Sequence, residues 1–358
     1  MKNVLYIILF LPLLVFSQVP FNTGLIEFGS PSPGWDDDNI NVSVFVNNKI
    51  YGGTEYSSHI VKTVPGSNQL IDLGRIGNID ERRGIHALTT NGRFIFGAAH
   101  CEGSTPYLFY IDSNNDVVTS IEATGFDEVK FISDGVFYDQ GANKFVFFAT
   151  ITNSGLYFIK WNVTSIINGT GTSSYELVQL ISGGFYDSQF IEQGWWNNIY
   201  EPVLFIGATN LSDGSKIIWR YNLGSYGFGN KASILFNNNY EIRNFKADNN
   251  PGCIWVFPKV ANNAYICKLN LINNSVLQSI YVNNWGRGAY DRIYFSSNNS
   301  YIFTHRGMVK KSNNKFYGFN SNSQFNGKSI LSNGSNTLYS IWSLGLSGYK
   351  YYYASISD

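Results

Sequence analysis

The chain has 358 residues, of which 14% are charged and 16% are aromatic. Its length is far above the minimum for a sizeable core. Lysine plus arginine and aspartate plus glutamate both number 25, so the formal net charge is zero. This balance argues against a nucleic-acid partner, which requires a basic face. Low charge with many Tyr, Phe, Asn, Gly and Ser is typical of a strand-rich extracellular protein.

Residues 1–17 have the features of a secretory signal peptide. Lys2 supplies the positive charge, Val4 to Phe16 are apolar, and Ser17 is small. An uncleaved membrane anchor is the alternative, but this run is shorter than the ~20 residues that span a bilayer. We therefore predict cleavage near Gln18 and a secreted, periplasmic or cell-surface protein with no membrane span, whose single domain covers residues 18–358.

One short run of strand formers recurs roughly every 50 residues and ends at a small or special residue. Aromatic and β-branched residues bounded by Asn and Gly turns are strand signals. The copies of this run end at Gly52, Gly97, Ala149, Gly207, Pro258, His305 and Ala354.

Three further strands accompany this run in most copies. An apolar strand follows it and closes on Asp or Asn, which can start the next turn. Its copies end at Asp112, Asn162, Asn222, Asn270 and Asn320. Another strand comes next (70–74, 117–121, 176–181, 233–236 and 276–282), and one precedes the run (42–46, 85–88 and 292–295). Four strands per repeat without helical periodicity predict an all-β fold of β-propeller blades. A pair of sandwiches is the alternative, but it has no reason to repeat one unit.

Counting the copies predicts seven blades, with six or eight as alternatives. The last copy is incomplete, and residues 25–29 (LIEFG) nearly repeat residues 70–74 (LIDLG). We therefore expect the N-terminal strand to join the C-terminal blade and close the ring. One strand of that blade has no evident sequence, so the blade could have three strands. The chain resembles secreted β-propeller proteins in architecture, without the WD dipeptides of WD40 repeats or a kelch double glycine, and resembles no particular family.

A large apolar residue followed by an acid recurs between the outer strand of one blade and the inner strand of the next. A ring of carboxylates at the channel mouth could bind a cation, a sugar or a basic peptide. The alternative is structural: each acid accepts backbone hydrogen bonds or pairs with a following Arg or Lys. Catalysis usually breaks symmetry, so a repeated acid favours the structural role. The pairs are Trp35-Asp36, Ile79-Asp80, Phe126-Asp127, Tyr186-Asp187, Tyr240-Glu241 and Tyr290-Asp291.

Other candidate ligand-binding residues are histidines and tryptophans. His100 and His305 fall in loops expected on the same face, without the spacing of a metal motif. Trp35, Trp195 and Trp196 flank the expected connectors, where they could stack on sugar rings or fill gaps between blades. Asp36, with the two aspartates after it, could supply oxygen ligands to calcium. No other cofactor is required.

Three cysteines are too few for a disulfide scaffold. Cys253 and Cys267 fall on neighbouring strands of one expected hairpin, so they could form a bridge outside the cell. Two buried thiols are the alternative. Cys101 is then unpaired, and no activating arrangement for a nucleophile accompanies it.

No catalytic residue emerges from these patterns. The favoured hypothesis is a secreted, monomeric, non-catalytic protein that binds a glycan or an extracellular protein on the connector face. One alternative is an extracellular glycoside hydrolase or lyase with an acidic channel mouth. Another is a structural surface or assembly component.

Overall fold

The structure, a computed structural model, describes a series of segments distributed over most of the chain. They are residues 21–28, 40–67, 69–77, 84–100, 104–126, 129–171, 173–183, 186–197, 200–212, 216–224, 227–228, 232–233, 240–260, 263–282, 294–295, 300–304, 307–318, 329–332, 337–343 and 349–356. Within them almost every regular element is a strand, and α1 (Thr164–Asn168) is the one helix.

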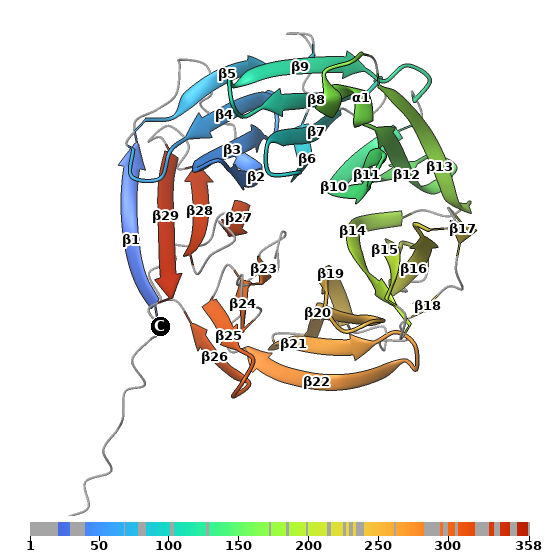
Figure 1. Cartoon of the computed structure of the whole chain (residues 1–358). Coiled ribbons are helices and arrows are strands. Elements are labelled where there is room, and N and C mark those ends of the chain that lie inside the picture. The colour runs from blue at the N-terminus through green and yellow to red at the C-terminus, as the bar shows by residue number, and fades with distance from the viewer. Residues whose placement is uncertain are drawn as a thin grey trace, which may run out of the picture.

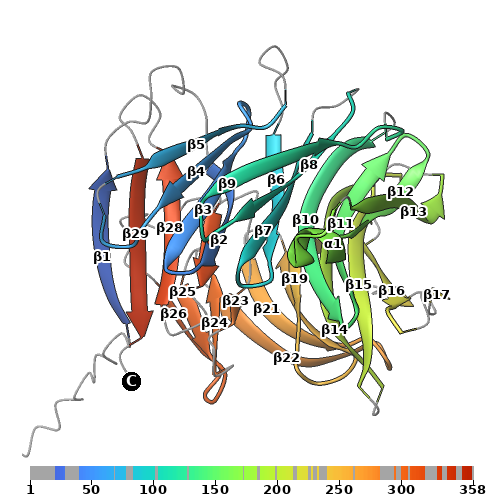
Figure 2. The same cartoon turned by 45° about the horizontal axis from the view of Figure 1, so that its top comes forward.

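The described strands form seven antiparallel sheets, which Figure 1 shows arranged side by side in a ring. We number the sheets along the chain, starting from β2. The first strand of each sheet lies on the inner side of the ring. Inner strands contact one another between sheets 1 and 2, 2 and 3, 3 and 4, 4 and 5, 6 and 7, and 7 and 1. Figure 2, a view turned by 45°, shows that the inner strands run through the thickness of the ring.

The strands of sheets 1 to 4 follow chain order from the inside outward. Sheet 1 has β2 (Ile40–Val46), β3 (Lys49–Thr54), β4 (His59–Thr63) and β5 (Ile71–Arg75). Sheet 2 has β6 (Gly84–Thr90), β7 (Phe94–His100), β8 (Tyr107–Asp112) and β9 (Val117–Glu122). Sheet 3 has β10 (Val129–Gln140), β11 (Asn143–Thr152), β12 (Gly155–Asn162) and β13 (Ser174–Ser182). Sheet 4 has β14 (Tyr186–Trp196), β15 (Glu201–Asn210) and β16 (Lys216–Asn222), with β17 (Gly227–Phe228) and β18 (Ala232–Ser233) both paired to β16.

Sheets 5 and 6 keep this order, and sheet 7 combines the two ends of the chain. Sheet 5 has β19 (Tyr240–Ala247), β20 (Cys253–Val260), β21 (Asn263–Asn270) and β22 (Ser275–Val282). Sheet 6 has β23 (Tyr294–Phe295), β24 (Tyr301–Thr304), β25 (Gly307–Lys310) and β26 (Lys315–Gly318). Sheet 7 has β27 (Ser329–Ser332), β28 (Thr337–Ser343), β29 (Tyr349–Ile356) and β1 (Phe21–Phe28).

Strand β1 is the outermost strand of sheet 7. It pairs antiparallel with β29 along its whole length, from Phe21 opposite Ile356 to Phe28 opposite Tyr349. The sequence left one strand of this sheet unassigned, and β27 occupies that place. Sheet 7 therefore has four strands rather than three.

Turn residues explain where several hairpins reverse. Asn47 and Asn48 form the two-residue connection between β2 and β3, and both have positive φ. Two positive φ values suit a type I′ turn, whose twist matches the flanking strands, and Asn tolerates this region better than most residues. The abundance of Asn in the chain thus serves its many tight turns.

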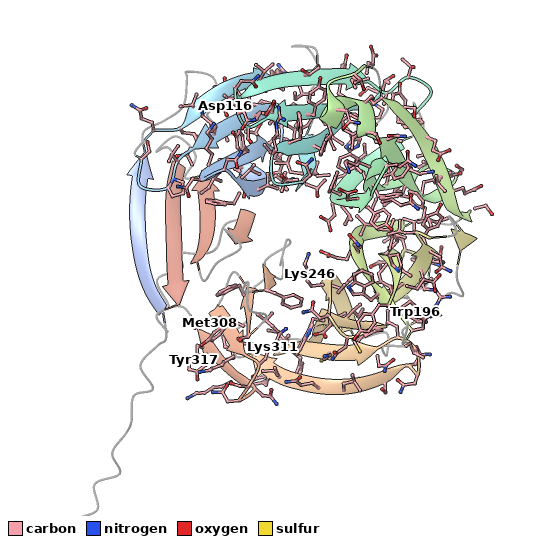
Figure 3. The ribbon with its side chains drawn as sticks, in the orientation of Figure 1. Asp116, Trp196, Lys246, Met308, Lys311 and Tyr317 are labelled. Atoms are coloured by element: carbon pink, nitrogen blue, oxygen red, sulfur yellow. The ribbon has the colours of Figure 1, made fainter. Side chains whose placement is uncertain are left out.

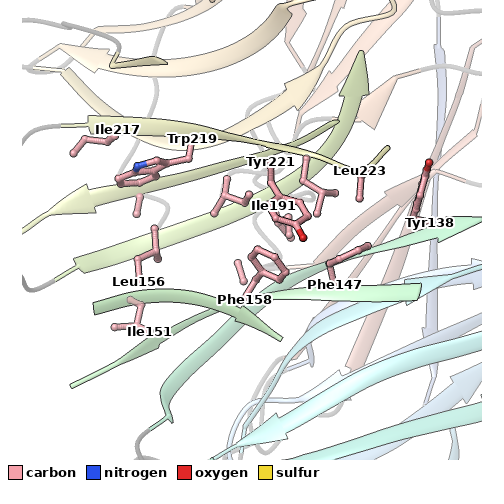
Figure 4. Close-up of a cluster of buried hydrophobic side chains, with 14 of the residues drawn as sticks. Tyr138, Phe147, Ile151, Leu156, Phe158, Ile191, Ile217, Trp219, Tyr221 and Leu223 are labelled. Atoms are coloured by element: carbon pink, nitrogen blue, oxygen red, sulfur yellow. The ribbon is translucent and has the colours of Figure 1, made fainter. Parts of the chain in front are cut away.

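The hydrophobic core is divided among the spaces between neighbouring sheets. Separate clusters of buried side chains join sheets 1 and 2, 2 and 3, 3 and 4, 4 and 5, and 5 and 6. Figure 4 shows the cluster between sheets 3 and 4, where Phe147 and Phe158 meet Ile191 and Tyr221. Sheets 2 to 5 are therefore apolar on both faces, as the near-continuous apolar runs of their second and third strands require.

Candidate functional site

A β-bulge recurs near the start of the inner strand in five sheets. At each one the inner strand carries one more residue than its partner. In sheets 1 to 3 the extra residues are Asn41, His86 and Lys130. Bulges redirect side chains and often occur beside functional sites. The sequence analysis did not identify Asn41 or His86. A bulge depends on how two strands pair, and it does not change the residue pattern within one strand.

The histidines at these bulges join adjacent sheets. The Asn41 side-chain amide contacts His86 Nδ1, so that nitrogen is the acceptor. His100, predicted as a ligand residue, is buried, and its Nε2 contacts the Lys130 carbonyl. The His86 and His100 rings lie on Phe131, with centroids 4.7 and 5.5 Å from its own. Both histidines therefore contribute to the contacts between sheets 1, 2 and 3.

Most predicted acidic residues fall outside the described part of the chain. Asp36, Asp80, Asp127 and Asp291 are among these, as are Trp35 and His305. The expected calcium ligands, Asp36 and the two aspartates after it, lie outside it as well.

The two remaining acidic pairs are strand residues rather than connector residues. Tyr186-Asp187 opens β14 and Tyr240-Glu241 opens β19. Asp187 is registered with Thr209, and Glu241 with Lys259. In these two copies the apolar–acid pair therefore marks where the inner strand begins.

Trp195 and Trp196 correct another expectation. They are the last two residues of β14, paired with Pro202 and Glu201, and do not flank a connector. The connector joins β14 at Tyr186, about 30 Å away along an extended strand. These tryptophans therefore lie at the other end of the inner strand, beside the turn to β15.

An exposed apolar surface surrounds Trp195. Its ring meets that of Tyr200 edge-on, with centroids 6.2 Å apart, and Tyr200 is 53% exposed. The Gly252 amide donates a 2.7 Å hydrogen bond to the Trp195 carbonyl, and Ile272, 52% exposed, packs on Gly252. We call Trp195, Tyr200 and Ile272 the Trp195 surface; it crosses from sheet 4 to sheet 5.

Arg220 supports this surface from the side. Its guanidinium lies 4.2 Å from the ring centroid of Trp196, a cation–π contact. Figure 3 labels Trp196. Burial lowers the pKa of Arg220, partly offset by the charge of Glu201. Trp196 is therefore held in the fold, whereas its neighbour Trp195 is exposed.

Comparisons with known proteins define the fold. No protein family model matches the chain, and no curated protein matches it. Among solved structures, the Dos1 propeller aligns with 11% identity and a TM-score of 0.54 over 93% of this chain and 96% of its own. The fold is a β-propeller. We call each numbered sheet the blade of the same number.

Two further propeller-type structures have the same TM-score of 0.54. Hydrazine synthase from Kuenenia stuttgartiensis is 9% identical, and the match covers 84% of this chain and 92% of that one. A puromycin-hydrolyzing peptidase of Mycobacterium tuberculosis is also 9% identical, over 89% of this chain and 53% of the peptidase. At these identities the resemblance shows the propeller fold alone.

A cation opposite an aromatic residue recurs between the second and third strands of the blades. Sequence reasoning overlooked it, although a cation two residues before a closing Asn is visible in IKWN, WRYN and CKLN. Four of these cations lie over an aromatic ring, as Lys268 does 5.8 Å from the Trp255 centroid; the other three are Lys160, Arg220 and Lys310. The registered pairs are Tyr51/Lys62, Phe147/Lys160, Phe205/Arg220, Trp255/Lys268, Tyr301/Lys310 and Trp342/Lys350.

Asp116 links blade 2 to blade 1, and Figure 3 labels it in that part of the ring. From the β8–β9 turn it accepts hydrogen bonds from Lys62 at 2.6 Å, Lys49 at 2.9 Å and the Tyr51 hydroxyl at 2.5 Å. Burial disfavours its charge, but these three donors outweigh burial and hold its pKa below the ordinary value. Burial, followed by the Asp116 hydrogen bond, raises the pKa of Tyr51.

A similar cluster joins blades 5 and 6. Asp248 accepts hydrogen bonds from the Trp255 indole at 2.5 Å and from Lys268 at 2.9 Å. Lys311 lies over Trp255 and over Phe295, the latter 4.1 Å from its ammonium. Burial lowers the pKa of Lys311 to about 8. These charges hold blades together, a structural role like that of Asp116.

The inner strands also carry an ion pair between blades 4 and 5. Lys246 on β19 donates to both carboxylate oxygens of Glu192 on β14, at 2.5 and 2.7 Å. Figure 3 places Lys246 on the inner side of the ring. The carboxylate and the ammonium neutralise each other there.

The Cys253–Cys267 bridge is not formed, because both residues are free, buried thiols. Cys253 is registered with Asn270 and Cys267 with Val256, which places the two cysteines three positions apart on opposite faces of the hairpin. Three residues extend about 10 Å, beyond the ~7 Å limit between bridged Cα atoms. Burial raises both thiol pKa values, which disfavours the reactive thiolate.

The described residues offer no group of three or more His, Cys, Asp or Glu side chains placed to hold a metal ion. Within the same residues, no helix is long and apolar enough to cross a membrane.

Proposed function

We propose that this chain is a secreted, closed seven-bladed propeller that binds another protein without catalysis, through the Trp195 surface. One observation carries the proposal. Trp195, Tyr200 and Ile272 gather on adjacent turns of blades 4 and 5, in contact through Gly252. Clustered exposed apolar side chains mark interaction sites more than single ones do.

The chemistry of this surface suits a protein partner. Trp and Tyr are the residues that most often dominate binding energy at protein interfaces. The Trp195 and Tyr200 rings are inclined at 67°, so they do not offer one flat platform for successive sugar rings. Ile272 adds an aliphatic contact, which packs better against protein side chains than against sugar hydroxyls. A glycan stacked on Trp195 alone is the alternative.

The other functions predicted from the sequence all place a ligand on the connector face. A glycan ligand, a calcium ion and the hydrolase or lyase alternative all depend on connector carboxylates. Asp36, Asp80, Asp127 and Asp291 lie outside the described residues, and Asp187 and Glu241 lie at the start of β14 and β19, so these functions stay predictions and our proposal rests on the Trp195 surface. A scaffold role would use the same surface to hold another protein in place.

The test uses the mature chain with a photo-crosslinking amino acid at Tyr200, exposed to the extracellular fluid of its source. We expect one predominant cross-linked protein, identified by mass spectrometry, whose yield falls about tenfold or more with Trp195→Ala. A tenfold loss of affinity for the purified partner would correspond to about 1.4 kcal/mol, on the scale of the larger single-residue effects at interfaces. Purified partner then gives the affinity by titration, with Ile272→Ala as the second variant.

Leu211→Ala is the matched control, since Leu211 is an exposed apolar residue at the other end of blade 4. It should bind as the wild type does. The same variants on a glycan array test the alternative: glycan binding that depends on Trp195 would replace the protein partner. If neither assay shows binding that Trp195→Ala weakens, this surface is not the binding site.

A further inference from the structure

Strand β22, the outer strand of blade 5, differs from the other long outer strands in having no charged residue. Its sequence is SVLQSIYV. An outer strand has one free backbone edge, and natural proteins usually protect such edges with charged side chains. The other outer strands carry Glu27 in β1, Asp72 and Arg75 in β5, Glu122 in β9, Glu176 in β13 and Lys315 in β26.

Apolar side chains of β22 are exposed as well as uncharged. Val276 is 57% and Tyr281 50% exposed, and Leu277 is also exposed. Figure 1 shows β22 on the outer rim of the ring, and among the described strands none pairs with its outer edge. The strand therefore presents backbone donors and acceptors beside apolar side chains, which is the chemistry that another strand recognises.

A bulge determines which residues share a face of β22. The pairing with β21 passes from Lys268–Gln278 to Leu269–Val276, so Leu277 is the extra residue. Beyond it, Ser279 is registered with Cys267 and Tyr281 with Tyr265. Because Cys267 and Leu269 pack in the cluster shared with blade 4, Val276, Ser279 and Tyr281 lie on that face. Ile280 points to the opposite face, into the cluster shared with blade 6.

This spacing makes β22 complementary to itself. We count Val276 and Leu277 of the bulge as one position and place two β22 strands antiparallel, with a two-fold axis between their Ser279 residues. Val276 of each copy then lies opposite Tyr281 of the other copy, which gives two such pairs. Gln278 then lies opposite Ile280. The two side chains of each opposed pair lie on the same face of the joined sheet. A β-branched residue opposite an aromatic is a favourable cross-strand pair. No like charges meet, because the strand has none.

We propose that two copies of this chain associate through antiparallel pairing of β22 with β22 about Ser279, joining blades 5 in one eight-stranded sheet. Two-fold contact of one patch with itself is the commonest symmetry of soluble dimers. This dimer would replace the monomer expected from the sequence. The residues varied in the two tests differ, so the failure of one proposal can be told from the failure of the other.

The test measures the mass of the mature chain by sedimentation equilibrium across a concentration series. We expect a concentration-dependent mass of twice one chain. Val276→Lys and Tyr281→Glu, made singly, should each raise the dissociation constant about tenfold or more, since a charge meets an apolar side chain at both pairs. The double variant Val276→Lys/Tyr281→Glu sets opposite charges at both pairs and should recover most of the dimer.

The control is Val117→Lys, which changes a valine that is 54% exposed on β9, the outer strand of blade 2. It should dimerise as the wild type does, and circular dichroism melts should show all variants folded. A wild-type chain that remains a single-chain species at every concentration overturns the proposal. So does an equal loss of dimer in Val117→Lys, or a double variant no better than the single ones.

Discussion

At the scale of single residues, Asp116 shows how one charge links two blades. One carboxylate in a β-turn accepts from two lysines and a tyrosine of the preceding blade. Its side chain is 19% exposed and those of Lys49 and Lys62 are 24% and 13% exposed, so solvent screens these pairs only partly. Asp116 therefore links blades 1 and 2 through these hydrogen bonds.

Replacing Asp116 with Asn should lower the unfolding free energy at pH 7 by about 2 kcal/mol, because two lysines lose their partner. The folded-state pKa of Asp116 is depressed, so its stabilisation is present above the unfolded pKa near 4 and is lost as pH falls through the folded value. The difference between wild type and variant, measured by urea unfolding, should therefore shrink from pH 5 towards pH 2.

Asp139→Asn is the control for this measurement. Asp139 also pairs with a lysine, Lys144 at 2.8 Å, but its side chain is 52% exposed. Exposed pairs contribute little to stability, so this variant should unfold nearly as the wild type does. Equal losses in both variants would contradict a special role for Asp116.

At the scale of elements, glycines late in the second strands allow neighbouring blades to pack closely. One of them, Gly207, ends the sequence run LFIG, and another, Gly53, follows the last residue of the run KIYG; both face an adjacent blade. A Cβ at Gly207 on β15 would lie 2.6 Å from the Phe245 ring of blade 5. Gly53 on β3 makes the same close approach to Ile85 of blade 2. The missing side chain is a packing requirement between blades.

Gly207→Ala should therefore destabilise the protein by about 1–3 kcal/mol, the usual cost of overpacking a core. Thermal unfolding of the variant checks this value. The double variant Gly207→Ala/Phe245→Leu removes the clashing ring edge and should cost less than the sum of its two single changes. If the two costs simply add, Phe245 is not what excludes the side chain.

At the scale of the whole molecule, the two ends of the chain meet in one sheet. β1 pairs with β29 through eight residue pairs, and the end of β29 lies beside the start of β1. Such pairing removes the exposed edge of β29. We predict that it also closes the ring and so contributes to the stability of every blade.

Deleting residues 19–30 should lower the melting temperature of the whole propeller in a single transition, because β29 loses its partner. A permuted chain that carries residues 19–30 after residue 358, on a short flexible linker, should recover the wild-type value. Differential scanning calorimetry of the wild type, the deletion variant and the permuted chain measures the three melting temperatures. An unchanged melting temperature after deletion would show that β1 does not close the ring.

The sequence alone predicted the all-β repeat, the propeller architecture and the regions of most strands. These follow from local signals: alternation of aromatic and β-branched residues, Asn turns, and a unit repeated roughly every 50 residues. It also paired LIEFG with LIDLG, which identified β1 as an outer strand before any contact was known.

Only the tertiary structure decided what depends on register. The offset of three positions keeps Cys253 and Cys267 apart, and the end of β14 places Trp195 and Trp196 beside a turn rather than a connector. The bulge at Leu277 decides which side chains of β22 share a face. A register is set by pairing between segments distant in the chain, and one inserted residue reverses every face beyond it. Such an offset leaves no trace in the residues of a single strand, which is why the sequence predicted the blades but not the surfaces that they form.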